Sequence, residues 1–244
     1  MNSAIKTSMV RRQLLKKLIA VAGAGTFSNL AFSQIVYALG KVPKPMEEGE
    51  SIFRLKGKVR VNGELANQQT KIPTNAAIET SENSELIFVV GKDAHLLREN
   101  SEVILSSDAQ QIETGAQLLK GKLMSVFGKR EGAEKHTTTT TTATIGIRGT
   151  AVYAESEHDR SYVCTCYGKV DLTASEDSTS FEAIRTTHHD SPRFVLANGE
   201  KGQLIQPAPM LNHGDDEIML INAILGLPTP FSALNDYSDI DLDY

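Results

Sequence analysis

The sequence contains no tryptophan and only two cysteines among its 244 residues, and aromatic residues make up 6% of it. Its core must therefore be mainly aliphatic, and two cysteines cannot build the disulfide framework of a small secreted domain. Between residues 50 and 200 no segment has the apolar spacing of an amphipathic helix. These absences exclude a disulfide-rich scaffold and a helical domain.

Charge is distributed unevenly along the chain. Residues 1–33 hold five of the 25 basic residues and no acidic one, which leaves 20 basic and 30 acidic residues, a formal charge of −10, for the remainder. A body this acidic repels phosphate groups. We therefore expect neither nucleic acid nor an anionic membrane surface as a partner.

The basic N-terminus has the features of an export signal. Arg11 and Arg12 precede a leucine pair, and a weakly apolar stretch of alanine and glycine follows at residues 18–25. The pattern resembles a twin-arginine signal peptide, which implies a chain that folds before it leaves the cytoplasm. We expect cleavage after Ser33 or Ala38 and a periplasmic protein with no stable membrane span. An uncleaved signal would instead give a membrane-anchored sensor.

Short strands are predicted for the body of the chain. From Ile52 onward apolar and polar residues alternate, and turn signals recur about every eight to twelve residues. The apolar run at 86–90 is long enough to be buried on both faces. This pattern predicts an all-β fold, either a small sandwich or a solenoid-like β-roll, with one short C-terminal helix that begins at Asp215 and ends before Gly226.

The composition divides the chain into four parts. We expect a signal peptide at 1–33, a linker at 34–50, a β domain with a C-terminal extension at 51–205, and the short helix with an acidic tail at 206–244. The helix should pack on the β domain, because a helix this short needs tertiary contacts. The charged segment 128–136 is predicted to be an exposed loop, and the threonine run at 137–142 an extended strand.

Two glycines, Gly146 and Gly149, flank Arg148, and Thr150 then begins a β-branched and aromatic run. Glycine lets backbones approach closely, and a guanidinium group can bind carbonyls or a carboxylate. We interpret Arg148 as a structural residue that braces a turn.

This signature and three other segments resemble a FecR domain over residues 57–172; the segments are 57–63, 85–91, 119–123 and 144–154. The namesake of the family spans the inner membrane, regulates an iron-responsive sigma factor and contacts an outer-membrane receptor. Here an export signal occupies the place of the cytoplasmic domain and membrane helix. The resemblance therefore implies a stand-alone, non-enzymatic binding, scaffold or signalling-accessory protein whose partner is a protein, the cell wall or a small ligand in the periplasm.

Metal binding is the alternative function. Cys164 and Cys166 lie two apart on a predicted strand, so their side chains share a face, with Cβ atoms about 6–7 Å apart and beyond disulfide reach. Two sulfurs so placed can share a copper or zinc ion with imidazoles. The candidate ligands are Cys164, Cys166, His188 and His189, with Asp190 to orient a histidine and His213 as a further ligand. The competing interpretation is that the cysteines are core residues and the histidines lie at the surface.

The sequence offers no catalytic arrangement. Ser191 lies near His188 and Asp190 in sequence only, and neither a nucleophile elbow nor a zinc-protease helix motif is present. We therefore predict a protein without enzymatic activity.

Overall fold

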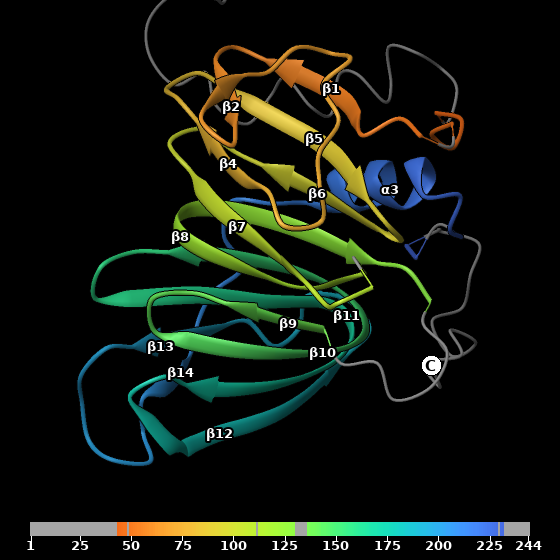
Figure 1. The fold of residues 1–244 in the computed structure, drawn as a ribbon. Coiled ribbons are helices and arrows are strands. Elements are labelled where there is room, and N and C mark those ends of the chain that lie inside the picture. The colour runs from red at the N-terminus through yellow and green to blue at the C-terminus, as the bar shows by residue number, and fades with distance from the viewer. Residues whose placement is uncertain (1–42, 48, 111, 130–135, 229, 232–244) are drawn as a thin grey trace, which may run out of the picture.

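A computed structural model describes residues 43–47, 49–110, 112–129, 136–228 and 230–231. The predicted signal peptide, its two cleavage positions and the end of the acidic tail lie outside the described residues. What is described is one open β-sheet and one short helix, which confirms the all-β prediction (Figure 1). The elements are β1 (Ile52–Lys56), β2 (Val59–Val61), β3 (Glu64–Leu65), β4 (Ala77–Thr80), β5 (Glu85–Val90), β6 (Asp93–Leu97), β7 (Glu102–Ser107), β8 (Glu113–Phe127), β9 (His136–Thr139), β10 (Ala143–Ser156), β11 (Arg160–Ala174), β12 (Asp177–Thr186), β13 (Arg193–Leu196), β14 (Ile205–Pro207) and α3 (Asp215–Ile224).

The sheet folds over into two layers because its three longest strands belong to both. β8 pairs with β7 and β9 through its first half and with β6 and β10 through its second half. β10 pairs first with β9 and then with β8, and β11 pairs first with β13 and then with β12. β10 and β11 stay paired with each other along most of their length. This agrees with the sandwich form of the prediction.

The change of layer in β10 and β11 occurs at two glycines in contact. Gly149 has φ +59° and Gly168 has φ +95°, backbone conformations that favour glycine. A Cβ atom on Gly168 would lie 2.5 Å from the carbonyl oxygen of Gly149 and 2.7 Å from Cβ of Thr150. The register of the two strands shifts at this point. Both glycines are therefore needed for the strands to bend together.

Arg148 lies one residue before this bend, on the outer surface. Its guanidinium group binds the carboxylate of Asp171 on β11, with Nη2 2.6 Å from Oδ2, and its side chain is 63% exposed. The residue thus links β10 to β11 through a surface ion pair, a type of contact that contributes modestly to stability.

Two hydrophobic cores lie on the two faces of the folded sheet. The inner core, between the layers, contains Leu86, Phe88 and Val163, whereas the helix-side core, between the outer face of one layer and α3, contains Ile87 and Tyr153. The run at 86–90 alternates between the two cores. Its expected burial on both faces is confirmed.

The helix closes the helix-side core. Ile218, Ile221 and Ile224 are buried there, which confirms that α3 packs on the β domain, and Figure 1 shows α3 beside β6. Gly226, with φ +69°, follows the helix end as predicted. Over the described residues, no helix combines the length and apolar content of a membrane span.

One sequence prediction for this region was wrong. His136 was assigned to an exposed loop, but it is 2% exposed and begins β9. β9 fits between β8 and β10 and continues through Thr137–Thr139, so the threonine run is a strand only in its first half. The charged composition of the preceding residues concealed this buried histidine, whose environment is made by distant strands.

Candidate metal centre

Cys164 and Cys166 project from the same face of β11 into the helix-side core. Both are fully buried and both are free thiols. Thr165 between them is also fully buried, on the opposite face of the strand. The alternation expected from the sequence therefore places two sulfur atoms beneath α3.

His189 reaches these sulfurs from the loop after β12. Its backbone has φ +52°, and its amide donates a hydrogen bond of 3.0 Å to the carbonyl of Cys166. The ring then lies inward, with Nδ1 3.6 Å from Sγ of Cys164. The neighbouring His188 is half exposed, and its Nε2 lies 2.9 Å from Oδ1 of Asp215. The left-handed backbone thus sends two adjacent histidines in different directions.

His213 completes the group from the segment before α3. Its ring stacks on Tyr153 with a centroid distance of 4.3 Å, and Nδ1 donates a hydrogen bond of 2.6 Å to the carbonyl of Leu211. A donating Nδ1 leaves the lone pair on Nε2. That lone pair lies 3.0 Å from Nδ1 of His189.

The segment that carries His213 is fastened to the sheet on both sides. The amide of Leu211 donates to the hydroxyl of Tyr162 at 3.0 Å, and the side chain of Asn212 donates to Glu155 at 2.7 Å. Arg98 donates to the backbone carbonyl of Asn212 at 2.9 Å. His213 is therefore held in place by contacts outside the candidate centre.

Four ligand atoms come within 4.8 Å of one another: Sγ of Cys164 and Cys166 and one ring nitrogen each of His189 and His213. With Zn–S of about 2.3 Å and Zn–N of about 2.0–2.1 Å, tetrahedral zinc separates a sulfur from a nitrogen ligand by about 3.6 Å and two nitrogens by about 3.3 Å. The observed separations are 3.6 Å between Cys164 and His189 and 3.0 Å between the two histidines. The distances suit tetrahedral ligation.

The outer nitrogens of both rings face acceptors, as is usual for metal-binding histidines. Nε2 of His189 lies 3.2 Å from Oδ1 of Asp215, at an angle outside good hydrogen-bond geometry, and Nδ1 of His213 faces the carbonyl of Leu211. Protons on these outer atoms leave two inner lone pairs directed at each other. Such an arrangement is favourable when a cation lies between them.

The pKa values of the two thiols are shifted in opposite directions. The pKa of Cys164 is lowered to about 4 by its interaction with the Cys166 thiol and then by its hydrogen bonds with His189 and His213, against the effect of burial. Burial raises the pKa of Cys166. A lowered pKa favours the thiolate form of Cys164, which is the form that binds metals, and Cys166 would release a proton on binding.

A pocket of about 610 Å³ gives access to the histidines. It is lined by His188, His189 and His213 and by the acidic first turn of α3, residues 215–217. Arg98, which binds Glu217 at 2.6 Å, also lines it. Carboxylates that line a pocket raise the local concentration of cations.

The structure brings together four of the six residues proposed from the sequence. Cys164, Cys166, His189 and His213 converge, whereas His188 lies outside the group and Asp190 is exposed. Asp215 occupies the orienting position expected of Asp190. Asp215 was not predicted because it lies far from the cysteines in the sequence, although its place two residues after His213 was a usable signal.

The signature around Arg148 and the strand that carries both cysteines lie in a segment that resembles a known family. Residues 76–171 match the family model described as FecR protein. This segment resembles FecR. The FecR match covers both glycine bends and both cysteines, but it begins after the segment 57–63 and ends before His189 and His213. The histidine half of the centre therefore lies beyond the FecR match.

Solved structures with partial likeness include two of a candidate anti-sigma factor from Parabacteroides distasonis ATCC 8503. One has 14% identity and a TM-score of 0.42, covering 51% of this chain and 56% of that chain. The other has 15% identity and a TM-score of 0.43, covering 51% and 57%. This chain thus spans little more than half the length of these structures. Among curated proteins there is no significant match.

Proposed function

We propose that the chain is an exported, non-enzymatic FecR-like signalling accessory whose β domain binds one zinc or copper ion through Cys164, Cys166, His189 and His213. The convergence of these four ligand atoms within 4.8 Å carries the proposal. Thiolate and imidazole ligands suit zinc and copper. Because all four ligands come from the protein, the ion would have no open position for catalysis, as in structural zinc sites.

The ion would tie three segments together. The cysteines belong to β11, His189 to the loop at 187–192, and His213 to the segment before α3. Binding would fasten this loop and α3 to the sheet, so the surface that the C-terminal segment offers to a protein partner would depend on the metal. Signalling accessory is the role that the FecR resemblance suggests; a metal-dependent surface is what the centre would add to it.

Elemental analysis of protein produced without a histidine tag tests the centre. We expect the double variant Cys164→Ser/Cys166→Ser to lose one equivalent of zinc or copper per chain relative to the wild type. The matched control is Thr165→Val, which alters a buried side chain between the two cysteines but on the other face. Equal metal content in the wild type and the double-serine variant, both folded, would rule the centre out.

Hydrogen exchange tests the tether. At free zinc of 100 times the Kd, binding stabilises the native state by about 2.7 kcal/mol. We expect amides of α3 and of residues 186–190 to exchange more slowly with zinc than with chelator, and not in the double-serine variant. Equal protection of α3 in both conditions would contradict the tether while leaving metal binding intact.

Export has its own test. The proposal is supported by the arginine pair at positions 11 and 12 and the apolar stretch after it. We expect the mass of the periplasmic protein to correspond to a chain that begins at Gln34 or Leu39, and Arg11→Lys/Arg12→Lys to block its appearance. An intact N-terminus on cytosolic protein would refute export, and on membrane-bound protein it would favour the anchored sensor.

A further inference from the structure

A second group of imidazole and carboxylate side chains is buried in the inner core, away from the cysteines. His95 lies on β6, Glu113 begins β8 and His136 begins β9; they are 0%, 3% and 2% exposed. Asp93, two residues before His95 on the same strand, is also fully buried. Four ionisable residues thus converge from three strands at one place between the layers.

One oxygen atom is the centre of this group. Oε1 of Glu113 lies 3.4 Å from Nε2 of His95 and 3.4 Å from Nε2 of His136. Nε2 of His136 lies 3.5 Å from Oδ2 of Asp93. The ligand atoms of Asp93, Glu113 and His136 all lie within 4.8 Å of one another.

These separations are long for hydrogen bonds but suit shared ligation. A charge-assisted bond between an imidazolium and a carboxylate is about 2.7–2.9 Å long. Two ligands on a tetrahedral zinc-sized ion, with nitrogen at about 2.0–2.1 Å and oxygen at about 2.0–2.2 Å, lie about 3.3–3.5 Å apart. The separation of Glu113 from His136 and that of His136 from Asp93 fall at this ligand-to-ligand distance, whereas His95 approaches the group only at Glu113.

The hydrogen-bonding state of the group also favours a ligand. Among the described residues, Nε2 of His95, Oε2 of Glu113 and Nδ1 of His136 are buried and lack a hydrogen-bond partner in good geometry. Buried polar atoms left unsatisfied are costly and uncommon. Nε2 of His95 is moreover directed at Oε1 of Glu113, so its lone pair or proton lies within the group.

The surroundings hold the rings in position. Nδ1 of His95 lies 2.8 Å from the hydroxyl of Ser125, which orients the ring from its outer side. Phe88 packs on His95 with a centroid distance of 4.9 Å, and Phe127 packs on His136 at 4.6 Å. An apolar shell around nitrogen and oxygen ligands keeps water away from them, as around a structural ion.

From this arrangement we propose a second metal site, in which Asp93, Glu113 and His136 bind a divalent first-row transition metal ion and His95 contacts Glu113 beside it. Imidazole and carboxylate ligands without sulfur suit zinc, iron, cobalt, nickel or manganese in the divalent state. The ion would join β6, β8 and β9 and so fasten the two layers together. Since the group is fully buried, we expect the ion to be taken up during folding.

Cobalt(II) distinguishes the two sites, because only thiolate ligands give a sulfur-to-metal charge-transfer band. The full chain is unfolded, stripped of metal and refolded with Co²⁺ alone. We expect two equivalents to be bound by the wild type, and one by Cys164→Ser/Cys166→Ser, whose spectrum retains visible d–d bands but has no charge-transfer band. If the spectrum of the wild type has no charge-transfer band, that result would count against the cysteine centre and not against this site.

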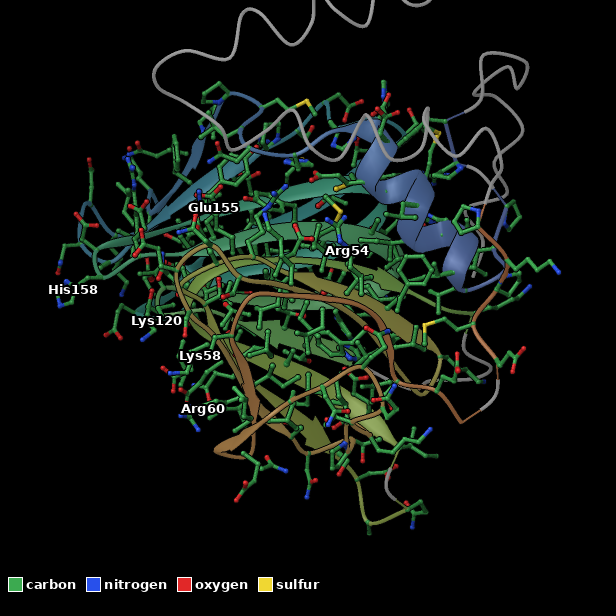
Figure 2. All side chains as sticks on the ribbon, turned by 90° about the horizontal axis from the view of Figure 1, so that it is seen from above. Arg54, Lys58, Arg60, Lys120, Glu155 and His158 are labelled. Atoms are coloured by element: carbon green, nitrogen blue, oxygen red, sulfur yellow. The ribbon has the colours of Figure 1, made fainter. Side chains whose placement is uncertain are left out.

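Two variants in the double-serine background locate the remaining ion. Glu113→Gln should bind no Co²⁺, whereas Glu102→Gln, which removes a carboxylate paired with Lys120 on the neighbouring strand, should still bind one equivalent. Bound Co²⁺ should also shift the ring signals of His95 and His136 in the NMR spectrum of the double-serine protein. His158 should be unaffected, since Figure 2 shows it projecting outward at the end of the molecule away from α3.

The NMR measurement needs no further substitution, so the proposal stays testable if Glu113→Gln fails to fold. A folded double-serine protein that binds no Co²⁺ would overturn it. So would bound Co²⁺ that shifts the signals of His188, His189 or His213 and leaves His95 and His136 unchanged.

Discussion

Replacing Gly168 with alanine should be one of the most destabilising small substitutions in the chain. At φ +95° an L-residue costs about 1–2 kcal/mol. The new Cβ would also lie 2.5 Å from the carbonyl oxygen of Gly149, where an ordinary contact is about 3.4 Å or more. Overpacking of this kind costs about 1–3 kcal/mol. The two effects together predict a loss of about 2–5 kcal/mol in the free energy of unfolding.

Gly63→Ala is the matched control. Gly63 has φ +81° in the turn between β2 and β3, but nothing lies within 4 Å of its Cβ position. The Gly63→Ala variant should therefore lose only the backbone contribution, about 1–2 kcal/mol, in its free energy of unfolding. The difference between the two variants isolates the crowding where β10 and β11 bend.

Urea denaturation and thermal melting, both with excess chelator, provide the assay, because chelation removes any stabilisation by bound metal. For a chain of this size each kcal/mol lowers the melting temperature by about 2–4 °C, so Gly168→Ala should melt about 4–20 °C lower and Gly63→Ala about 2–8 °C lower. Equal losses in both variants would refute the reasoning, since the contact with Gly149 would then have no energetic effect.

Three further predictions concern other parts of the fold. Arg148→Ala should cost no more than about 1 kcal/mol in urea denaturation, because its ion pair is exposed; a loss above about 2 kcal/mol would show a larger structural role. Hydrogen bonds from Thr179 and Gly202 lower the pKa of Asp177. The ionised Asp177 side chain therefore stabilises the fold fully above the pKa of the unfolded state, about 3.9. This stabilisation is lost as the pH falls through the lower pKa of the folded state. The stability difference between wild type and Asp177→Asn should therefore shrink below about pH 4, and a constant difference across that range would contradict this. Ile221→Ala, which leaves a cavity under α3, should cost about 2–5 kcal/mol; a cost below 1 kcal/mol would mean that the helix is loosely attached.

The local parts of the fold were readable from the sequence because they depend on neighbouring residues. Asn62 and Gly63, with φ of +50° and +81°, make the turn that this dipeptide predicts. Alternation placed Cys164 and Cys166 on one face, and the acidic start and Gly226 marked the limits of α3. The folding of the sheet over itself was not readable, since it depends on bends in strands that are adjacent only in space.

The candidate centre was predicted in part for the same reason. Both cysteines follow from strand geometry, but the choice of His189 over His188 depends on a left-handed backbone conformation at one residue. Asp215 could be found only once the segment before α3 was known to return to β11. The group around Glu113 was missed entirely, because its members come from separate segments and His136 was assigned to a loop.

The passage of β8, β10 and β11 through both layers has a consequence for how the protein loses its structure. Neither layer can separate alone, since each would have to break strands that the other retains. Melting should therefore be a single event across the whole β domain, and a ligand bound anywhere on these strands should slow the opening of remote ones. In a protein built in this way, a ligand bound at one end of the β domain can make the strands at the other end more rigid without changing their positions.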